Sequence, residues 1–372
     1  MNHSYKRWAC ALLALVLMAL LSCAALVWAV DPCLYFRIPA DGKAVFFNER
    51  YQNAGLARNL PADTVLLGTS MVANYRASHV AEVFGGTAVK LTVPDGYLGE
   101  FDAVLGQAFS RHTPKRVLFG LDINILTRDE GGVTGALPDY LYDENPMNDV
   151  KYLLNRDALY YSAYTLLEKA RGAAQILDDA YTWDAGTWWN HMTALENYER
   201  PDTAGETLPE TAYLANVEGH VNTILSWAQT HPSTEFDVFF PPYSILYWDK
   251  TARLGETDAV FSALDAAVKA LLAGNSAHNL RVFFLPAATE ITGNLDYYCD
   301  YIHHSGDAAD KALHLLQAGD FEVTGVEAWT EMLHNWRQFV VHYDYDQLWT
   351  DAYWWKWNID HGAPIVWKSE NE

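Results

Sequence analysis

Three side chains of this sequence have the types and spacing of a nucleophilic catalytic set. Ser70 follows the apolar run Thr64–Leu67 and Gly68, where a buried strand would end in a turn. Asp300 stands three residues before His303, a spacing at which a carboxylate at the start of a helix can orient an imidazole by accepting from one ring nitrogen. The other nitrogen could then take the proton of a serine hydroxyl. These residues predict a Ser70–His303–Asp300 triad; taken singly, Ser70 and Asp300 also fit helix N-caps.

The elements that would position these residues are those of a parallel sheet. Five segments have the length and composition of buried strands: Thr64–Leu67, Ala88–Val93, Arg116–Asp122, Phe236–Phe240 and Arg281–Leu285. Helices are expected over 77–84, 100–110, 253–272, 307–317 and 326–341. Alternating strands and helices predict βαβ units, hence an α/β fold with a five-stranded parallel sheet. Ser70 and His303 would then both lie at the carboxyl edge, where such sheets bind ligands.

Two parts of the chain fall outside this pattern. An insertion at about residues 128–235 is too long for an ordinary crossover and contains expected helices over Ala158–Ala180 and Glu210–Thr230. It also carries the aromatic stretch Tyr181–His191. The C-terminal tail is rich in tryptophan (Trp349, Trp354, Trp355, Trp357 and Trp367) and either packs on the core or forms part of a binding cleft.

The N-terminus has the composition of a membrane anchor. The uncharged run Trp8–Val30 follows Lys6 and Arg7, and at about 1.5 Å per residue it covers the roughly 30 Å hydrocarbon core. Cations on its N-terminal side predict a cytoplasmic N-terminus over residues 1–7, a transmembrane signal anchor over 8–30 and an extracytoplasmic domain over 31–372. A cleaved signal peptide ending near Ala29 is the competing interpretation.

Composition narrows the class of function. The formal net charge of −22 disfavours nucleic-acid binding, because such a surface repels phosphate backbones. No Cys/His spacing resembles a zinc site and no phosphate-binding loop is present, so we expect neither a metal nor a cofactor. Cys33 and Cys299 lie outside the apolar run and could either pair in an oxidising compartment or remain free thiols.

In these segments the chain resembles the SGNH/GDSL hydrolase superfamily. Gly68-Thr69-Ser70 is similar to the first block of that family and Asp300-x-x-His303 to its fifth. Val93-Pro94-Asp95-Gly96 follows the second strand, where the family places an oxyanion-hole glycine, and Gly120-Leu121-Asp122-Ile123 falls on the third block. The resemblance covers roughly residues 60–318 and implies a flavodoxin-like three-layer fold, with the insertion and tail outside it.

The resemblance also implies roles for individual residues. Ser70 would be the nucleophile, His303 the general base and Asp300 its orienter, while the backbone N–H groups of Ser70 and Gly96 would bind the oxyanion. Asp122 stands where the family has a donor asparagine, and an ionised carboxylate donates no hydrogen bond.

Three further residues complete the expected site. Asn124, two residues beyond Asp122 and on the same side of an extended strand, could substitute as donor. Asp122, Tyr243 and Ser244 are candidates for the substrate rim, although the last two also fit a simple turn after Pro241-Pro242.

The overall layout is similar to membrane-anchored bacterial relatives that act on the cell envelope, such as alginate acetyltransferases and the protein that assists D-alanylation of teichoic acids. The resemblance therefore implies a serine esterase or O-acyltransferase that acts on a cell-surface glycan, with a multispanning acyltransferase as partner. The alternative is a non-catalytic envelope protein that binds glycan or a membrane partner. Asp122, at the position of an oxyanion donor, favours this alternative.

Overall fold

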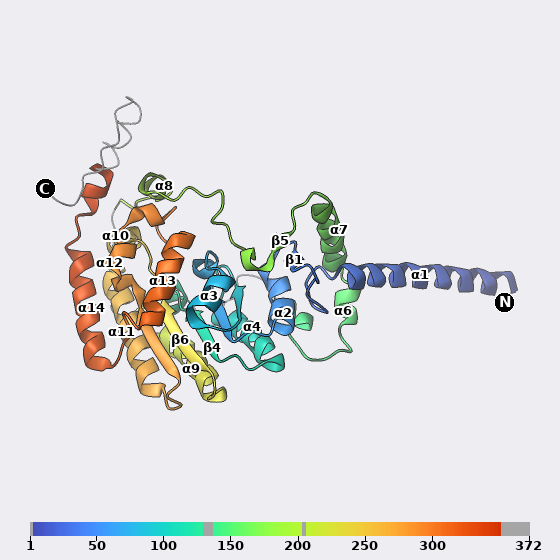
Figure 1. Ribbon diagram of the computed structural model, residues 1–372, viewed down its shortest axis with the longest axis horizontal. Coiled ribbons are helices and arrows are strands. Elements are labelled where there is room, and N and C mark those ends of the chain that lie inside the picture. The colour runs from blue at the N-terminus through green and yellow to red at the C-terminus, as the bar shows by residue number, and fades with distance from the viewer. Residues whose placement is uncertain (1–2, 129–136, 203–205, 351–372) are drawn as a thin grey trace, which may run out of the picture. The chain divides into compact units, whose positions relative to one another are not determined.

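The sheet has the predicted strands and direction. The computed structural model describes residues 3–128, 137–202 and 206–350. The fold is α/β, and its five strands form one sheet in the order β3-β2-β4-β6-β7 (Figure 1). Strands β2 and β3 pair in parallel, as do β6 and β7. Their bounds are β2 (Thr64–Gly68), β3 (Ala88–Thr92), β4 (Arg116–Gly120), β6 (Glu235–Phe240) and β7 (Leu280–Phe284). A separate antiparallel pair joins β1 (Lys43–Ala44) to β5 (Gln175–Ile176), which the sequence pattern did not predict.

The described chain divides into two compact units. Of the described residues, unit 1 comprises 3–119, 137–182 and 233–235, and unit 2 comprises 120–128, 183–202, 206–232 and 236–350. The helices of unit 1 are α1 (His3–Val30), α2 (Glu49–Asn59), α3 (Ala77–Phe84), α4 (Leu98–Arg111), α6 (Val150–Leu153) and α7 (Arg156–Ala170), with 3-10 turns η1 (Ser70–Val72), η2 (Asp139–Leu141) and η3 (Leu177–Asp179).

Unit 2 contains the remaining helices. These are α5 (Ile123–Thr127), α8 (His191–Glu196), α9 (Leu214–Thr230), α10 (Ile245–Arg253), α11 (Thr257–Gly274), α12 (Thr289–Thr292), α13 (Gly306–Ala318) and α14 (Val326–Val341), with 3-10 turns η4 (Leu285–Ala287) and η5 (Leu295–Tyr297). In unit 2, α11 contacts α9, α5, α10 and α14, so it is the central helix of that unit.

An ion pair between a buried carboxylate and a partly exposed arginine joins β6 to β7. Asp237 is 1% exposed, lies directly opposite Arg281 and accepts from both Nε and Nη2 of its guanidinium at 2.8 and 2.9 Å. The other strand residues are almost all buried apolar side chains, as expected of a parallel sheet. A shift of one residue would bury Asp237 without its partner, which would disfavour that register.

Two expected helices were wrong in their bounds, and glycines explain both. The helix expected over Ala158–Ala180 ends at Ala170, because Gly172 turns the chain at φ +79 before β5 and η3. The helix expected over residues 253–272 is α11, which begins four residues later, at Thr257, because α10 ends at Arg253 and Gly255 turns the chain between the two helices at φ +69.

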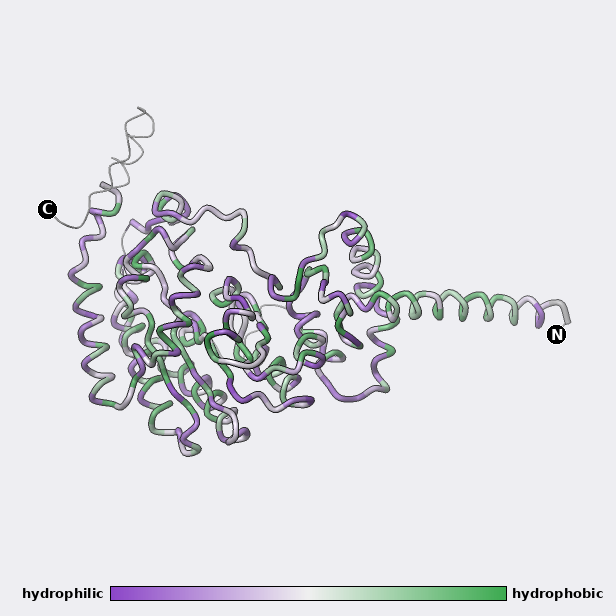
Figure 2. The backbone as a smooth tube through the Cα atoms, in the orientation of Figure 1, coloured by the Kyte–Doolittle hydropathy of each residue, from purple (hydrophilic) through white to green (hydrophobic). Residues whose placement is uncertain are grey.

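Helix α1 is long and apolar enough to cross a membrane. Within Tyr5–Val30 an 18-residue stretch has a mean hydropathy of 2.8 and is largely exposed, and Figure 2 shows most of α1 as a hydrophobic tube.

The two cysteines outside the apolar helix do not pair, and one tryptophan of the C-terminal tail packs on the domain. Cys33 and Cys299 are free, buried thiols. Burial raises the pKa of both, that of Cys299 to about 12, so neither has the thiolate character of a reactive cysteine. Among the expected aromatic tail residues, Trp349 contacts Tyr198 and Arg200, whereas Trp354, Trp355, Trp357 and Trp367 lie outside the described residues.

Candidate active site

Ser70 lies in unit 1 on a tight turn at the carboxyl end of β2. The strand ends at Gly68, and Ser70 is the first residue of η1 and half-buried. Thr69, in extended conformation, caps η1 by accepting from the N–H of Met71 at 3.2 Å. The capping function therefore belongs to Thr69, and Ser70 is not the residue that caps the turn.

A buried lysine holds the chain that follows Ser70. Lys90, in the middle of β3, is 3% exposed, and its Nζ donates to the carbonyl oxygens of Ala73 and Tyr75 and to Oγ1 of Thr182. The bonds to Tyr75 and Thr182 are 2.7 and 2.9 Å long. The sequence analysis did not identify Lys90. The available signal was a lysine inside an otherwise apolar strand, where an ammonium needs oxygen partners.

The segment that supplies Thr182 is fastened to unit 1 at several points. Asp178 accepts from both the N–H and Oγ of Ser78 at 2.7 Å, at the start of α3. The hydroxyl of Tyr181 donates to Oε1 of Gln52 at 2.8 Å. This middle part of the insertion thus supports the turn that carries Ser70.

Gly96 occupies a turn of unit 1 into which only glycine fits. A Cβ there would lie 2.7 Å from the carbonyl oxygen of Val93 and 2.9 Å from the ring of Phe101. The preceding Asp95 has φ +53, and the Gly96 N–H donates to the Val93 carbonyl at 2.9 Å. To bind an oxyanion, the Gly96 N–H would have to break its hydrogen bond to the Val93 carbonyl or divide its donation between the two oxygens.

Unit 2 contains the predicted Asp300–His303 pair in the expected geometry. His303 Nδ1 lies 2.7 Å from Oδ2 of Asp300, and both side chains are 24% exposed. Asp300 Oδ1 accepts from the backbone N–H groups of Ile302 and His303 at 2.8 and 2.7 Å, an Asx-type turn that fixes the carboxylate. Nδ1 therefore serves the carboxylate, and Nε2 is the nitrogen suited to proton transfer.

The pair sits in a loop between η5 and α13, so the expectation that it starts a helix was wrong. Helix α13 begins at Gly306 and is capped by Ser305, whose Oγ accepts from Ala308 N–H at 3.3 Å. Burial raises the pKa of Asp300, but the hydrogen bonds from His303 and its backbone outweigh burial, and the pKa lies below its usual value. Asp300 is consequently ionised at neutral pH.

An aromatic side chain of the insertion packs against the imidazole. The Trp183 and His303 rings meet edge to face with centroids 5.1 Å apart, and Trp183 also contacts Trp189. Asp184 accepts from the Gly306 N–H at 3.0 Å, which ties this segment to the start of α13. The aromatic stretch was noted in the sequence, but its contact with His303 was not predicted.

Ser244 is hydrogen-bonded to the same loop. It is fully buried, caps α10 by accepting from Leu246 N–H at 3.2 Å and donates its Oγ to the Tyr301 carbonyl at 2.7 Å. Tyr301 lies between Asp300 and His303, so Ser244 positions the loop of the pair.

The other candidate rim residues are also buried. Tyr243 and Asp122 are 0% and 6% exposed, so neither contributes an exposed rim. Burial raises the pKa of Tyr243 well above its usual value, and the nearby charge of Asp122 adds to that effect. The phenol is therefore a neutral neighbour of the Asp122 carboxyl.

The reason for expecting Asn124 beside Asp122 was wrong. Strand β4 ends at Gly120, Asp122 is the residue before α5, and Asn124 lies within that helix. Residues two apart on a helix do not share a face, whereas on a strand they do. Asn124 is half-buried, while its neighbours Ile123 and Ile125 belong to the core.

Replacement of Ser244 by alanine tests its positioning role. We expect a loss of about 1–2 kcal/mol in the free energy of unfolding, because a helix cap and the partner of a buried carbonyl are both removed. Urea unfolding followed by circular dichroism measures this loss. The control is Ser226→Ala, an exposed serine of α9, which should change stability by less than about 0.5 kcal/mol. Equal effects of the two substitutions would contradict the role of Ser244.

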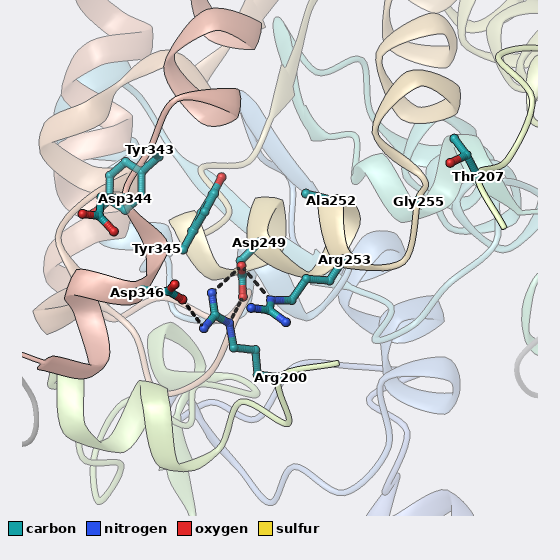
Figure 3. Close-up of a pocket in the computed structure, with 10 residues that line it drawn as sticks. All are labelled: Arg200, Thr207, Asp249, Ala252, Arg253, Gly255, Tyr343, Asp344, Tyr345 and Asp346. Atoms are coloured by element: carbon teal, nitrogen blue, oxygen red, sulfur yellow. Dashed lines mark hydrogen bonds and ion pairs between the residues drawn. The ribbon is translucent and has the colours of Figure 1, made fainter. Parts of the chain in front are cut away.

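A polar cavity of about 540 Å³ in unit 2 is lined by charged side chains, and its two arginines are paired with carboxylates (Figure 3). Asp249 is 2% exposed and accepts from Nε and Nη2 of Arg200 at 2.7 and 3.0 Å and from Arg253 at 3.3 Å. Arg200 also bonds Asp346 at 2.7 Å and lies over the Trp349 ring. The cluster ties the chain after α14 to α10.

Comparisons with known proteins add no assignment. No protein-family model matches the chain, and no curated protein matches it significantly in sequence. Within the described residues there is no cluster of three or more His, Cys, Asp or Glu side chains that could hold a metal ion. Function is therefore inferred from two sets of residues, each described within its own unit: Ser70 and Gly96 in unit 1, and Asp300 and His303 in unit 2.

Proposed function

We propose that this protein is a membrane-anchored, extracytoplasmic serine esterase or O-acyltransferase of the SGNH type, which acts on acyl groups of a cell-surface polysaccharide. The single observation that best supports this proposal is the Asp300–His303 pair, with its 2.7 Å bond and the carboxylate fixed by two backbone N–H groups. A histidine held in this way has one tautomer and one nitrogen directed to proton transfer. Ser70, on a tight turn at the end of β2, is the nucleophile.

The reaction proceeds in two balanced halves. His303 Nε2 removes the hydroxyl proton as Ser70 Oγ attacks the acyl carbonyl, and the imidazolium returns that proton to the departing oxygen. A sugar hydroxyl or water then attacks the carbonyl of the acyl-Ser70 ester and gives its proton to His303. The imidazolium returns this proton to Ser70 Oγ as the acyl–Oγ bond breaks, which releases the acylated sugar or the free acid. This mechanism requires Ser70 of unit 1 and His303 of unit 2 to come within hydrogen-bond distance.

Stabilisation of the oxyanion is the weaker part of the proposed site. The backbone N–H of Ser70 is one donor, and that of Gly96 is a second if it leaves the turn that it closes with Val93. Each such donor contributes about 10²–10³ in rate. Asp122 donates nothing when ionised, and we assign no donor role to Asn124 on the basis of its helical position.

Helix α1 is proposed to remain as the anchor, with the N-terminus in the cytoplasm. Its last turn is part of the folded unit: Val27 is fully buried, and Arg37 Nη2 donates to the carbonyl oxygens of Trp28 and Ala29 at 2.6 and 2.7 Å. Cleavage after Ala29 would remove the residues that these contacts hold. A multispanning acyltransferase in the same membrane is the partner that would supply acyl groups.

The test is covalent labelling of the full-length protein with a serine-directed fluorophosphonate. We expect an adduct on the wild type and on Ser226→Ala, and none on Ser70→Ala, because only a serine activated by a base reacts. Mass spectrometry of the labelled peptide identifies the residue. Labelling of Ser70→Ala at the wild-type level would refute the assignment of the nucleophile.

A second candidate function is a non-catalytic protein that binds envelope glycan. It is favoured by Asp122, a buried carboxylate where the family has a donor amide, and by the occupied Gly96 N–H. This alternative predicts no fluorophosphonate adduct on the wild type together with retention of the protein on immobilised cell-wall glycan.

A further inference from the structure

Helix α7 carries apolar side chains on the face directed away from its own core. Ala158, Ser162 and Thr165 are buried and lie on one side of the helix. Tyr160 and Leu167 are 65% and 49% exposed, and helical spacing places them on the opposite side. Leu166 is also 49% exposed, but helical spacing places it between that face and the buried side. A helix that faces water would carry polar residues there, so α7 is not built for an aqueous surface alone.

Cations flank this apolar face. Between Val150 and Arg171 the sequence has four cationic side chains, Lys151, Arg156, Lys169 and Arg171, against two carboxylates, in a chain whose formal net charge is −22. Apolar side chains with lysine and arginine at the ends are typical of a helix that lies in a membrane interface. The local excess of positive charge fits anionic lipid headgroups.

The position of α7 along α1 matches the expected depth of that interface. Trp8 and Trp28 are 72% and 55% exposed and lie 20 residues apart, which is about 30 Å of helix and equals the hydrocarbon thickness. Val27, next to Trp28, shares one buried cluster with Ala158 of α7. If α1 spans the membrane, the start of α7 is held at the level of the outer tryptophan.

Buried hydrogen bonds hold the end of α1 to the rest of unit 1. The buried carboxylate of Asp31 accepts from the backbone N–H groups of Tyr35, Phe36 and Arg37 at 2.9–3.0 Å and from the Tyr152 hydroxyl at 3.1 Å. Helix α1 contacts both α6 and α7. Figure 1 shows α6 and α7 beside the C-terminal end of α1, with α7 running across its direction. A spanning α1 therefore orients α7 along the membrane plane.

We propose that α7 is a second membrane contact, with Tyr160 and Leu167 inserted among the lipids of the outer leaflet and its terminal cations at the headgroups. This inference rests on the anchoring part of the proposed function and is independent of the acyl chemistry. It gives unit 1 two attachments to the bilayer, which would restrict how the turn that carries Ser70 can rotate above the surface.

The test uses the full-length protein in vesicles of phosphatidylcholine and phosphatidylglycerol. In a background with Cys10→Ala and Cys23→Ala, which leaves only the buried Cys33 and Cys299, one cysteine is introduced at Leu167, Leu13 or Ser110 and labelled with an NBD fluorophore. Quenching by nitroxide-labelled lipids is then measured, and the background protein without an added cysteine gives the unspecific labelling. Leu13 lies in α1 and reports anchoring, and Ser110 is an exposed residue at the end of α4. We expect several-fold stronger quenching at Leu167 than at Ser110, most effectively with the nitroxide near the headgroup.

Each other outcome overturns the inference in a distinguishable way. Quenching at Leu13 without quenching at Leu167 would leave α1 as the anchor and remove α7 from the membrane. Quenching at neither position would refute the anchoring on which the inference rests. A Leu167 label that lipid nitroxides do not reach in vesicles, but that is shielded from aqueous iodide in native membranes, would assign the face to a protein partner instead.

Discussion

Replacement of Asp300 by asparagine is expected to lower esterase turnover about 10⁴-fold while the protein stays folded. The single carbonyl oxygen of asparagine can still accept from the N–H groups of Ile302 and His303, so the Asx turn persists. Its NH₂ group would then face His303 Nδ1 and select the tautomer with the proton on Nε2. That tautomer cannot accept the Ser70 proton. The measurement is kcat with a chromogenic acetate ester, together with the melting temperature.

The matched control is Asp307→Asn, a change of the same kind at an exposed position in the first turn of α13. It should alter turnover by less than about twofold and stability by less than about 0.5 kcal/mol. If Asp300→Asn retained turnover within about tenfold of the wild type, the carboxylate would not orient the catalytic base. Because the pKa of Asp300 lies below its usual value, the carboxylate would stay ionised across the neutral range.

Replacement of Lys90 by methionine is expected to cost about 3 kcal/mol of stability and to impair the turn of Ser70. Methionine has a similar length but no donor, so the carbonyl oxygens of Ala73 and Tyr75 lose a buried partner. Chemical denaturation measures the loss. The control is Lys115→Met, which removes a lysine whose side chain is 79% exposed and paired with Asp63, and which should cost less than about 1 kcal/mol.

The pH dependence of the same variant provides an independent readout. Burial lowers the pKa of Lys90 to about 7 in the folded protein, and the acidic neighbours Asp178 and Asp179 offset part of that effect. In the unfolded chain the pKa is about 10.4, so between the two values the unfolded state binds more protons and stability rises with pH. From about pH 7 to about pH 9 the wild type should gain on the order of 2 kcal/mol relative to Lys90→Met. An unchanged difference across that range would show that Lys90 keeps its charge.

The strands could be predicted because each is a short continuous run of apolar residues, which is the composition of a buried strand. All five predicted segments are strands in the structure, each within two residues of its expected ends, since continuous apolar runs of this length have few other stable environments. Helix bounds were less predictable. Gly172 and Gly255 end helices at positions where the apolar pattern continues. A glycine within such a pattern does not by itself show that the chain takes a positive φ there.

In the candidate site, too, local features could be predicted from the sequence and contacts between distant residues could not. The bond between Asp300 and His303 follows from a spacing of three residues and local backbone geometry, so the sequence predicted it. The surroundings of Asp122 and Asn124 were mispredicted, because β4 ends two residues earlier and the chain enters α5. Ser244 was expected near the site, but its bond to the Tyr301 carbonyl joins residues 57 positions apart.

The sequence alone determined the α/β class, the apolar N-terminal helix and the local pair of Asp300 and His303. These features depend on composition and on residues a few positions apart, where chain geometry leaves little choice. Only the tertiary structure decided that Lys90 supports the Ser70 turn, that Trp183 packs on His303 and that α7 lies at the end of α1. Those contacts join residues distant in the chain, and their partners are selected by the packing of whole elements rather than by any local pattern.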